Sequence, residues 1–118
     1  MGIRDKIINT LQGLNYEIRL QGSYRVDNMP DSLITYWIPS ATDLRSYNNR
    51  PQKSGYAISI GFYSRQIDLI DTVSELISDL MLEAGFTREG PGQDAGFDKD
   101  TGHYGWLMDF YFVERKEM

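Results

Sequence analysis

The residues best suited to chemistry lie toward the end of the sequence, where Asp94, Asp98 and Asp100 precede the only histidine, His103. Carboxylate oxygens and an imidazole nitrogen are ligands that divalent metal ions accept. The spacing differs from that of an EF-hand loop, which has a glycine at its sixth position and a distal glutamate. The pattern therefore favours a solvated acidic loop, and a metal-dependent enzyme is the least favoured of three functional hypotheses.

Other catalytic motifs are incomplete in this sequence. His103 would have to act as the base of a serine triad, but no G-x-S-x-G segment presents a serine, and there is no cysteine. Gly90-Pro91-Gly92 begins like a phosphate-binding loop without the Gly-Lys-Ser/Thr that completes one, and Glu89 and Asp94 flank it. We therefore expect a protein without catalytic residues, metal or cofactor.

Composition narrows the function classes further. The 118 residues are 41% hydrophobic and 25% charged, which predicts a single globular domain over residues 1–118, with a frayed tail at 114–118. No apolar run approaches the ~20 residues of a membrane span, and the start of the chain lacks a signal-peptide core, so we expect synthesis in the cytoplasm and no membrane contact. The net charge of −5 and the scattered basic residues disfavour sequence-specific binding of nucleic acid.

Two amphipathic helices are predicted. Apolar residues recur at helical spacing from Ile3 to Leu14, and Gly13 and Asn15 supply stop signals. The clearer helix runs from Ile67 to Ala84, and Gly85 stands where a left-handed residue often ends a helix. The predicted buried stripe of this second helix is Leu69, Val73, Leu76, Ile77, Leu80 and Ala84.

Four strands are predicted, over residues 16–26, 33–38, 55–64 and 103–113. Pro39 is expected to end the second strand. Gly55–Ser64 has large apolar residues on one face and mostly small residues on the other, which would let a second backbone or subunit come close. His103–Val113 is bulky on both faces, as expected for a central strand or one half-covered by a partner. A polar loop is predicted for 40–54, and a turn-rich loop with a short strand at either end for 87–102.

This order of elements lacks strict βαβ alternation. It predicts an α+β fold: a mixed, mainly antiparallel sheet with two helices packed on one face. Side chains in the two long loops, outside the core pattern, are the best candidates for contacts with other subunits or partners. These candidates are Arg45, Tyr47, Arg50, Asp94 and Asp98.

Taken together, the segments resemble the tail-completion proteins of long-tailed phages and prophages, also described as tail-to-head joining or tail-terminator proteins. The resemblance covers roughly residues 1–114, and lies in the order and lengths of the segments 33–37, 46–51 and 56–64, the helix through Leu80, the turn 83–86 and the closing strand 104–113. It implies a non-catalytic virion assembly protein, present in the host cytoplasm during assembly and then in the tail. Such proteins cap the tail tube as a ring, commonly of six subunits, and dock to the head connector.

A second hypothesis is a small adaptor or regulatory domain that binds another protein as a monomer or dimer. A ring former carries two different, complementary patches, whereas a two-fold dimer uses one self-complementary patch. Apart from the resemblance, the sequence leaves these two alternatives open.

Overall fold

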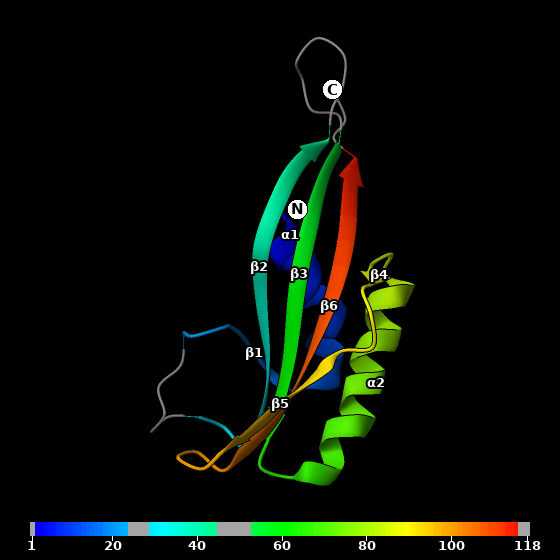
Figure 1. Ribbon diagram of the computed structural model, residues 1–118. Coiled ribbons are helices and arrows are strands. Elements are labelled where there is room, and N and C mark those ends of the chain that lie inside the picture. Colours follow the sequence, from blue (N-terminus) through cyan, green and yellow to red (C-terminus); the bar gives the residue numbers. More distant parts are fainter. Residues whose placement is uncertain (1, 24–28, 45–52, 116–118) are drawn as a thin grey trace.

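The computed structural model describes residues 2–23, 29–44 and 53–115. Figure 1 shows the helices and strands formed by these residues. In chain order they are α1 (Ile3–Leu11), the 3₁₀ turn η1 (Gln12–Leu14), β1 (Glu17–Leu20), β2 (Ser32–Leu44), β3 (Lys53–Ser64), α2 (Ile67–Glu83), β4 (Thr87–Arg88), β5 (Gln93–Asp98) and β6 (His103–Arg115).

Three long strands, β2, β3 and β6, form the centre of the sheet. β3 pairs antiparallel with β2 on one side and with β6 on the other. The short β1 adds parallel to β2, while β4 and β5 follow one another along the far side of β6. The sheet is therefore mixed and mainly antiparallel, which confirms the predicted α+β fold. The last strand was predicted to be central or half-covered by a partner, and β6 has neighbours on both sides along part of its length.

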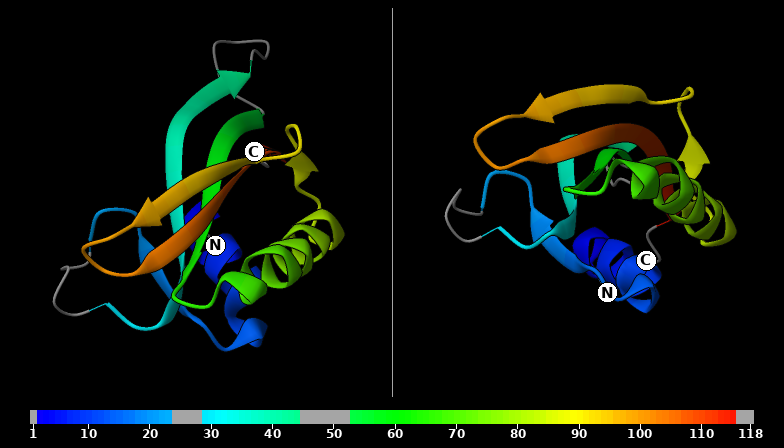
Figure 2. Two further views of the ribbon diagram at one scale, coloured as in Figure 1. Left: turned by 60° about the horizontal axis from the view of Figure 1, so that its bottom comes forward. Right: turned by 90° about the horizontal axis from the view of Figure 1, so that it is seen from below.

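Both helices cover the same face of the sheet, as predicted, and Figure 2 shows them on one side of it. The alternation of β3 turns Ile58, Ile60 and Phe62 toward the helices, where all three are buried. Met108 and Phe110 of β6 lie beside them. Each helix contributes one buried stripe to the same core: Ile3, Ile7 and Leu11 from α1, and Ile70, Val73, Ile77 and Met81 from α2.

The buried stripe of α2 differs from the predicted one. Val73 and Ile77 are buried as expected, but Leu76 is 46% exposed. The buried arc instead includes the serines Ser74 and Ser78. Leu69, Leu80 and Ala84 of the predicted stripe are partly buried against the core. Arg88 donates a hydrogen bond of 3.0 Å to the Ser78 hydroxyl, and hydrophobic periodicity alone carries no sign of such a polar contact.

The end of α2 follows the sequence signal. Gly85 has a φ of +97°, in the left-handed region. The N–H of Phe86 bonds to the carbonyl of Met81, and that of Gly85 to the carbonyl of Leu82. These two bonds satisfy carbonyls that the helix leaves free, and Phe86 is buried beneath the last turn.

Pro39 does not end β2, so the prediction of a loop beginning at Ser40 was wrong. The register between β2 and β3 shifts between Trp37 and Ser40, and residues 40–44 then pair with residues 57–53. An irregularity of this kind accommodates a proline, which has no N–H to give to a ladder, at a place where the strand lies at the edge of the sheet. The remainder of the predicted loop, 45–52, lies outside the described residues.

The segment 87–102 is more ordered in strands than expected. The short strand β4 opens it, as predicted, but β5 occupies its middle and forms a hairpin with β6. The sequence Gln-Asp-Ala-Gly-Phe-Asp of β5 is exposed at every position, so it lacks the hydrophobic alternation from which a half-buried strand is predicted.

Candidate interaction surfaces

Two of the five predicted contact residues lie within the described structure. Asp94 and Asp98 are exposed on β5. One oxygen of Asp94 accepts the N–H of Gly96 at 2.7 Å, and one oxygen of Asp98 accepts the N–H of Asp100 at 2.9 Å. Bonds of this type shape local turns, so each carboxylate has a structural task. Arg45, Tyr47 and Arg50 lie outside the described residues.

The acidic residues and His103 do not assemble into a metal centre. Within residues 2–23, 29–44 and 53–115, no group of three or more histidine, aspartate or glutamate side chains is arranged to hold a metal ion. That part of the chain includes all four residues of the metal hypothesis. Asp98, Asp100 and His103 line a hollow of about 690 Å³ at the β5–β6 turn, together with Lys99 and Tyr63, whereas Asp94 lies outside it.

His103 is held as a structural residue. Its side chain is 2% exposed, and Nε2 lies 2.8 Å from the carbonyl oxygen of Pro30. Because a carbonyl only accepts, Nε2 must carry the proton of this bond. Nδ1 has no hydrogen-bond partner among the described groups, so the histidine does not face a serine hydroxyl there as a catalytic base would.

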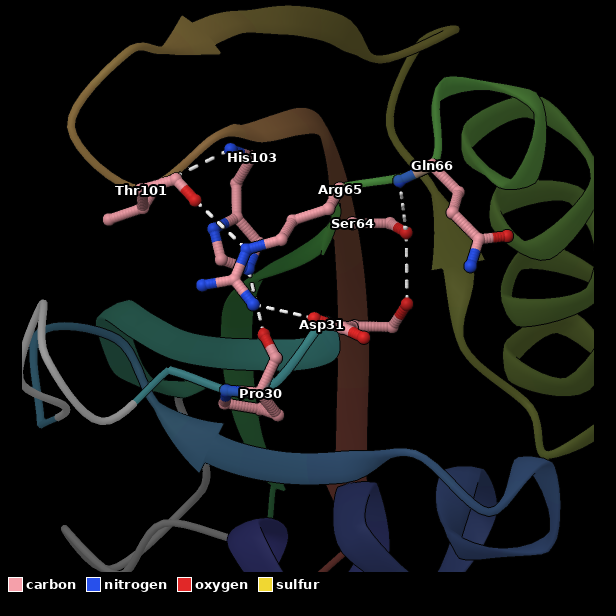
Figure 3. A network of polar contacts seen from close by, with 8 residues as sticks. Pro30, Asp31, Ser64, Arg65, Gln66, Thr101 and His103 are labelled. Carbon is pink, nitrogen blue, oxygen red and sulfur yellow. Dashed lines mark hydrogen bonds and ion pairs between the residues drawn. The ribbon is translucent and has the colours of Figure 1, made fainter.

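A network of polar contacts ties three segments together around His103, as Figure 3 shows. Arg65, just after β3, donates from Nε to the carbonyl of Thr101 at 2.9 Å, and its guanidinium pairs with Asp31 at 2.5 Å. The hydroxyls of Ser32 and Ser64 lie 2.9 Å apart. The start of β2, the β3–α2 connection and the β5–β6 turn are thereby joined at one end of the sheet, which we call the junction end.

The sheet face turned away from the helices, which we call the open face, has buried side chains near the junction end and exposed side chains farther along the strands. Near the junction, Leu33 and Thr35 are buried on this face. Toward the other end, Trp37 is 49% exposed and Val113 is 44% exposed, with Tyr111 half-buried between the strands. Trp37 and Val113 lie on separate strands, β2 and β6, so each is an exposed apolar group on its own side of β3.

Two glycines on this face, Gly55 of β3 and Gly105 of β6, are covered by the chain's own tyrosines, so a second backbone cannot approach at these two places. A β-carbon on Gly105 would lie 2.6 Å from the ring of Tyr63, its partner across the β3–β6 pair. A β-carbon on Gly55 would lie 2.8 Å from the ring carbon of Tyr111 that bears the hydroxyl. A partner that approaches Gly55 or Gly105 would therefore meet a tyrosine ring.

At the end opposite the junction, at the top of Figure 1, two strand edges have no partner among the described strands. β1 reaches only residues 33–36 of β2, so among the described strands only β3 pairs with residues 40–44. β4 reaches only residues 110 and 111 of β6, so residues 112–115 likewise pair only with β3 among the described strands. Unpaired N–H and C=O groups of this kind are ready to pair with another chain.

Sequence reasoning missed both the edges and the junction network. Pro39 within an otherwise strand-like stretch was the available sign of an edge strand, since proline is confined to such positions. Arg65 carries no local sign of its role, because its partners Asp31 and Thr101 are distant in sequence.

The described residues contain no helix long and apolar enough to cross a membrane.

Comparison with protein-family models and with curated proteins finds no match to this chain. The resemblance to tail-completion proteins thus rests on the order and lengths of the sequence segments.

Proposed function

We propose that this chain is a non-catalytic assembly protein whose copies join into a ring, in the manner of the phage tail-completion proteins that it resembles. The observation that carries the proposal is the pair of different free edges, on β2 and on β6, at the same end of one sheet. Two different patches that meet head to tail generate a closed ring when the rotation between subunits closes.

The directions of the strands suit this arrangement. β2 and β6 both run antiparallel to β3, so they run parallel to one another. Rotation about an axis along the strands preserves their direction, and β6 of one subunit would therefore add parallel to β2 of the next. A two-fold dimer built from β2 against β2 would instead make an antiparallel pair.

The open face supports the same proposal. Trp37 and Val113 stand beside the two free edges, where they would add apolar contact area to each junction between subunits. The tail tube protein and the head connector, as partners of the completed ring, follow from the resemblance, as does a subunit number of six.

The test is the mass of the assembled protein, measured by native mass spectrometry and sedimentation over a concentration series, for the parent chain and for edge variants. Proline is placed on the β2 edge as Ala41→Pro or Thr42→Pro, and on the β6 edge as Val113→Pro or Glu114→Pro. Neighbouring residues direct their N–H groups to opposite sides of a strand. In each pair, the variant that keeps the parent's circular dichroism is the one that removes an outward N–H, and it is the one used.

A head-to-tail ring predicts a closed oligomer larger than a dimer for the parent chain. Each edge variant alone should be monomeric, and an equimolar mixture of the two should form one-to-one pairs through the intact edges. A parent chain that stays monomeric at all concentrations contradicts the ring. A dimer abolished by the β2 variant but not by the β6 variant would also contradict it, and would support the adaptor alternative.

A further inference from the structure

A groove runs between α2 and the strand β5, over the side of β6 that faces the helices. It consists of two adjoining hollows of about 290 and 230 Å³ that share Asp71 and Trp106 in their walls. Ser74, Glu75 and Arg88 complete the first hollow, and Asp94 and Tyr104 lie along the second. We call this feature the α2–β5 groove.

The charge of the α2–β5 groove is mainly negative. Asp71 and Glu75 are exposed on α2, and Asp94 faces them from β5. Arg88 is the one basic residue in the walls, and its guanidinium donates to the carbonyls of Gly90 and Pro91 and to a serine hydroxyl of α2. Three carboxylates therefore outnumber one cation in the groove. Helix α2 itself contains no lysine or arginine, so it supplies no countercharge.

Ser74 provides a second, independent observation at the groove. Its side chain is 6% exposed and lines the groove, and its hydroxyl has no hydrogen-bond partner among the described groups. Buried hydroxyls are ordinarily paired, because an unpaired one loses the hydrogen bonds that it would make with water. The neighbouring serine of α2, by contrast, is paired with Arg88.

The floor of the groove is aromatic. Trp106 and Tyr104 are half-buried there. A β-carbon on Gly92 would lie 2.6 Å from Nε1 of Trp106, so the backbone between β4 and β5 packs closely against the indole and holds it in place. Carboxylates above an aromatic floor suit a cation, which can pair with the former and stack on the latter.

We propose that the α2–β5 groove binds an arginine side chain of a partner protein. A divalent metal is disfavoured because no three acidic side chains in the described structure are close enough to hold one. A planar guanidinium makes two parallel bonds to a carboxylate and also stacks on aromatic rings. The carboxylates that line the groove are exposed, so a bound side chain would remain open to solvent on one side, where the rest of the partner chain supplies contact area.

This inference rests on the proposed function only in taking the occupant to be another protein chain; the sheet edges play no part in it. The test uses the Trp37→Phe background, in which Trp106 is the only tryptophan left of the two. Its fluorescence is followed at a protein concentration where the chain is monomeric. The probe is the capped peptide acetyl-Gly-Arg-Gly-amide, and its matched control has citrulline, a neutral isostere, in place of arginine.

The arginine peptide should give a saturable change in fluorescence, and the citrulline peptide should give none over the same range. Asp71→Asn with Glu75→Gln should weaken the binding by roughly tenfold, since two ion pairs are lost. Asp68→Asn with Asp79→Asn removes the same charge from the same helix outside the groove, and should leave the affinity within about twofold. Ser74→Ala should weaken the peptide by a few-fold while leaving the fold intact by circular dichroism.

Equal responses to the arginine and citrulline peptides would overturn the proposal, and so would equal losses in the groove variant and its charge-matched control. Because the peptide titration is made on monomeric chains, binding without ring formation would retain the groove and reject the ring. Ring formation without peptide binding would support the ring and reject the groove as an arginine site.

Discussion

The two faces of the central strands are built from different residues. On the face beneath the helices, Ile58, Ile60 and Phe62 of β3 meet Met108 and Phe110 of β6, and all five are fully or almost fully buried. Helices provide the second layer on this side. Burial of large aliphatic and aromatic groups between the layers supplies most of the free energy that stabilises such a domain.

No helix of the described residues covers the opposite face, and its strands use glycine and tyrosine instead. Tyr63 covers Gly105, and Tyr111 covers Gly55. An aromatic ring that lies over a glycine on a neighbouring strand restores contacts that the glycine lacks. The comparison teaches that the helices stabilise one face as a second layer. On the other face, tyrosine rings cover glycines, and the side chains of Trp37 and Val113 stay exposed, where a partner could contact them.

The largest expected effect is on the covered face. Phe62→Ala should lower the free energy of unfolding by about 3–5 kcal/mol, because the side chain is fully buried and leaves a cavity against Tyr16. Urea denaturation measures this loss. The matched variant on the open face, Tyr111→Ala, should lower it by less than half as much, and equal losses would remove the distinction between the faces.

A smaller loss is expected where a tyrosine covers a glycine. Gly105→Ala should lower the free energy of unfolding by about 1–3 kcal/mol, because the new methyl group would meet the ring of Tyr63 at 2.6 Å. Gly13→Ala is the control, since a β-carbon there would meet no described atom within 4 Å. If both variants have the parent's midpoint in urea, the ring does not lie over Gly105 in solution.

A modest gain is expected at Thr35, whose buried hydroxyl has no hydrogen-bond partner among the described groups. Thr35→Val keeps the shape and removes the unpaired hydroxyl, so it should raise the free energy of unfolding by about 1 kcal/mol. Thr10→Val should do the opposite, because Thr10 donates a bond of 2.6 Å to the carbonyl of Lys6. Thermal unfolding of the pair gives the sign; destabilisation by Thr35→Val would show that its hydroxyl is satisfied.

The smallest effect on the free energy of unfolding is expected at Val113, at the exposed rim of the open face. Val113→Thr should change the free energy of unfolding of the monomer by no more than about 0.5 kcal/mol, since the side chain is 44% exposed. Chemical denaturation at a concentration below association isolates this quantity. A loss above about 1 kcal/mol would mean that the rim is already covered in the single chain.

Local sequence patterns predicted the helices and strands that bury one regular face of apolar side chains. The alternation in β3 gave its buried side correctly, and Gly85 marked the end of α2. The extension of β2 beyond Pro39 and the strand β5 were missed, because pairing with β3 and β6 holds them in place and their own residues are polar or proline. Leu76 was misplaced because the buried arc of α2 includes Ser74 and Ser78, which hydrophobic periodicity does not count as core residues.

The candidate site was less accessible to prediction than the fold. Asp94 and Asp98 were chosen as loop residues, and they lie on a strand where each also shapes a turn. The free edges depend on how far β1 and β4 reach along their neighbours, a length that appears only once the ladders are formed. The ring and its phage partners stay predictions.

The place of β6 in the strand order has a consequence for the protein's synthesis. β6 follows in the sequence every strand with which it pairs, yet it lies at the centre of the sheet. While the chain leaves the ribosome, β3 therefore waits with one whole edge unpaired and β5 has no partner at all. A nascent chain in that state exposes the kind of edge that aggregates, so slow translation of the β6 codons should increase the demand for chaperones and lower the soluble yield.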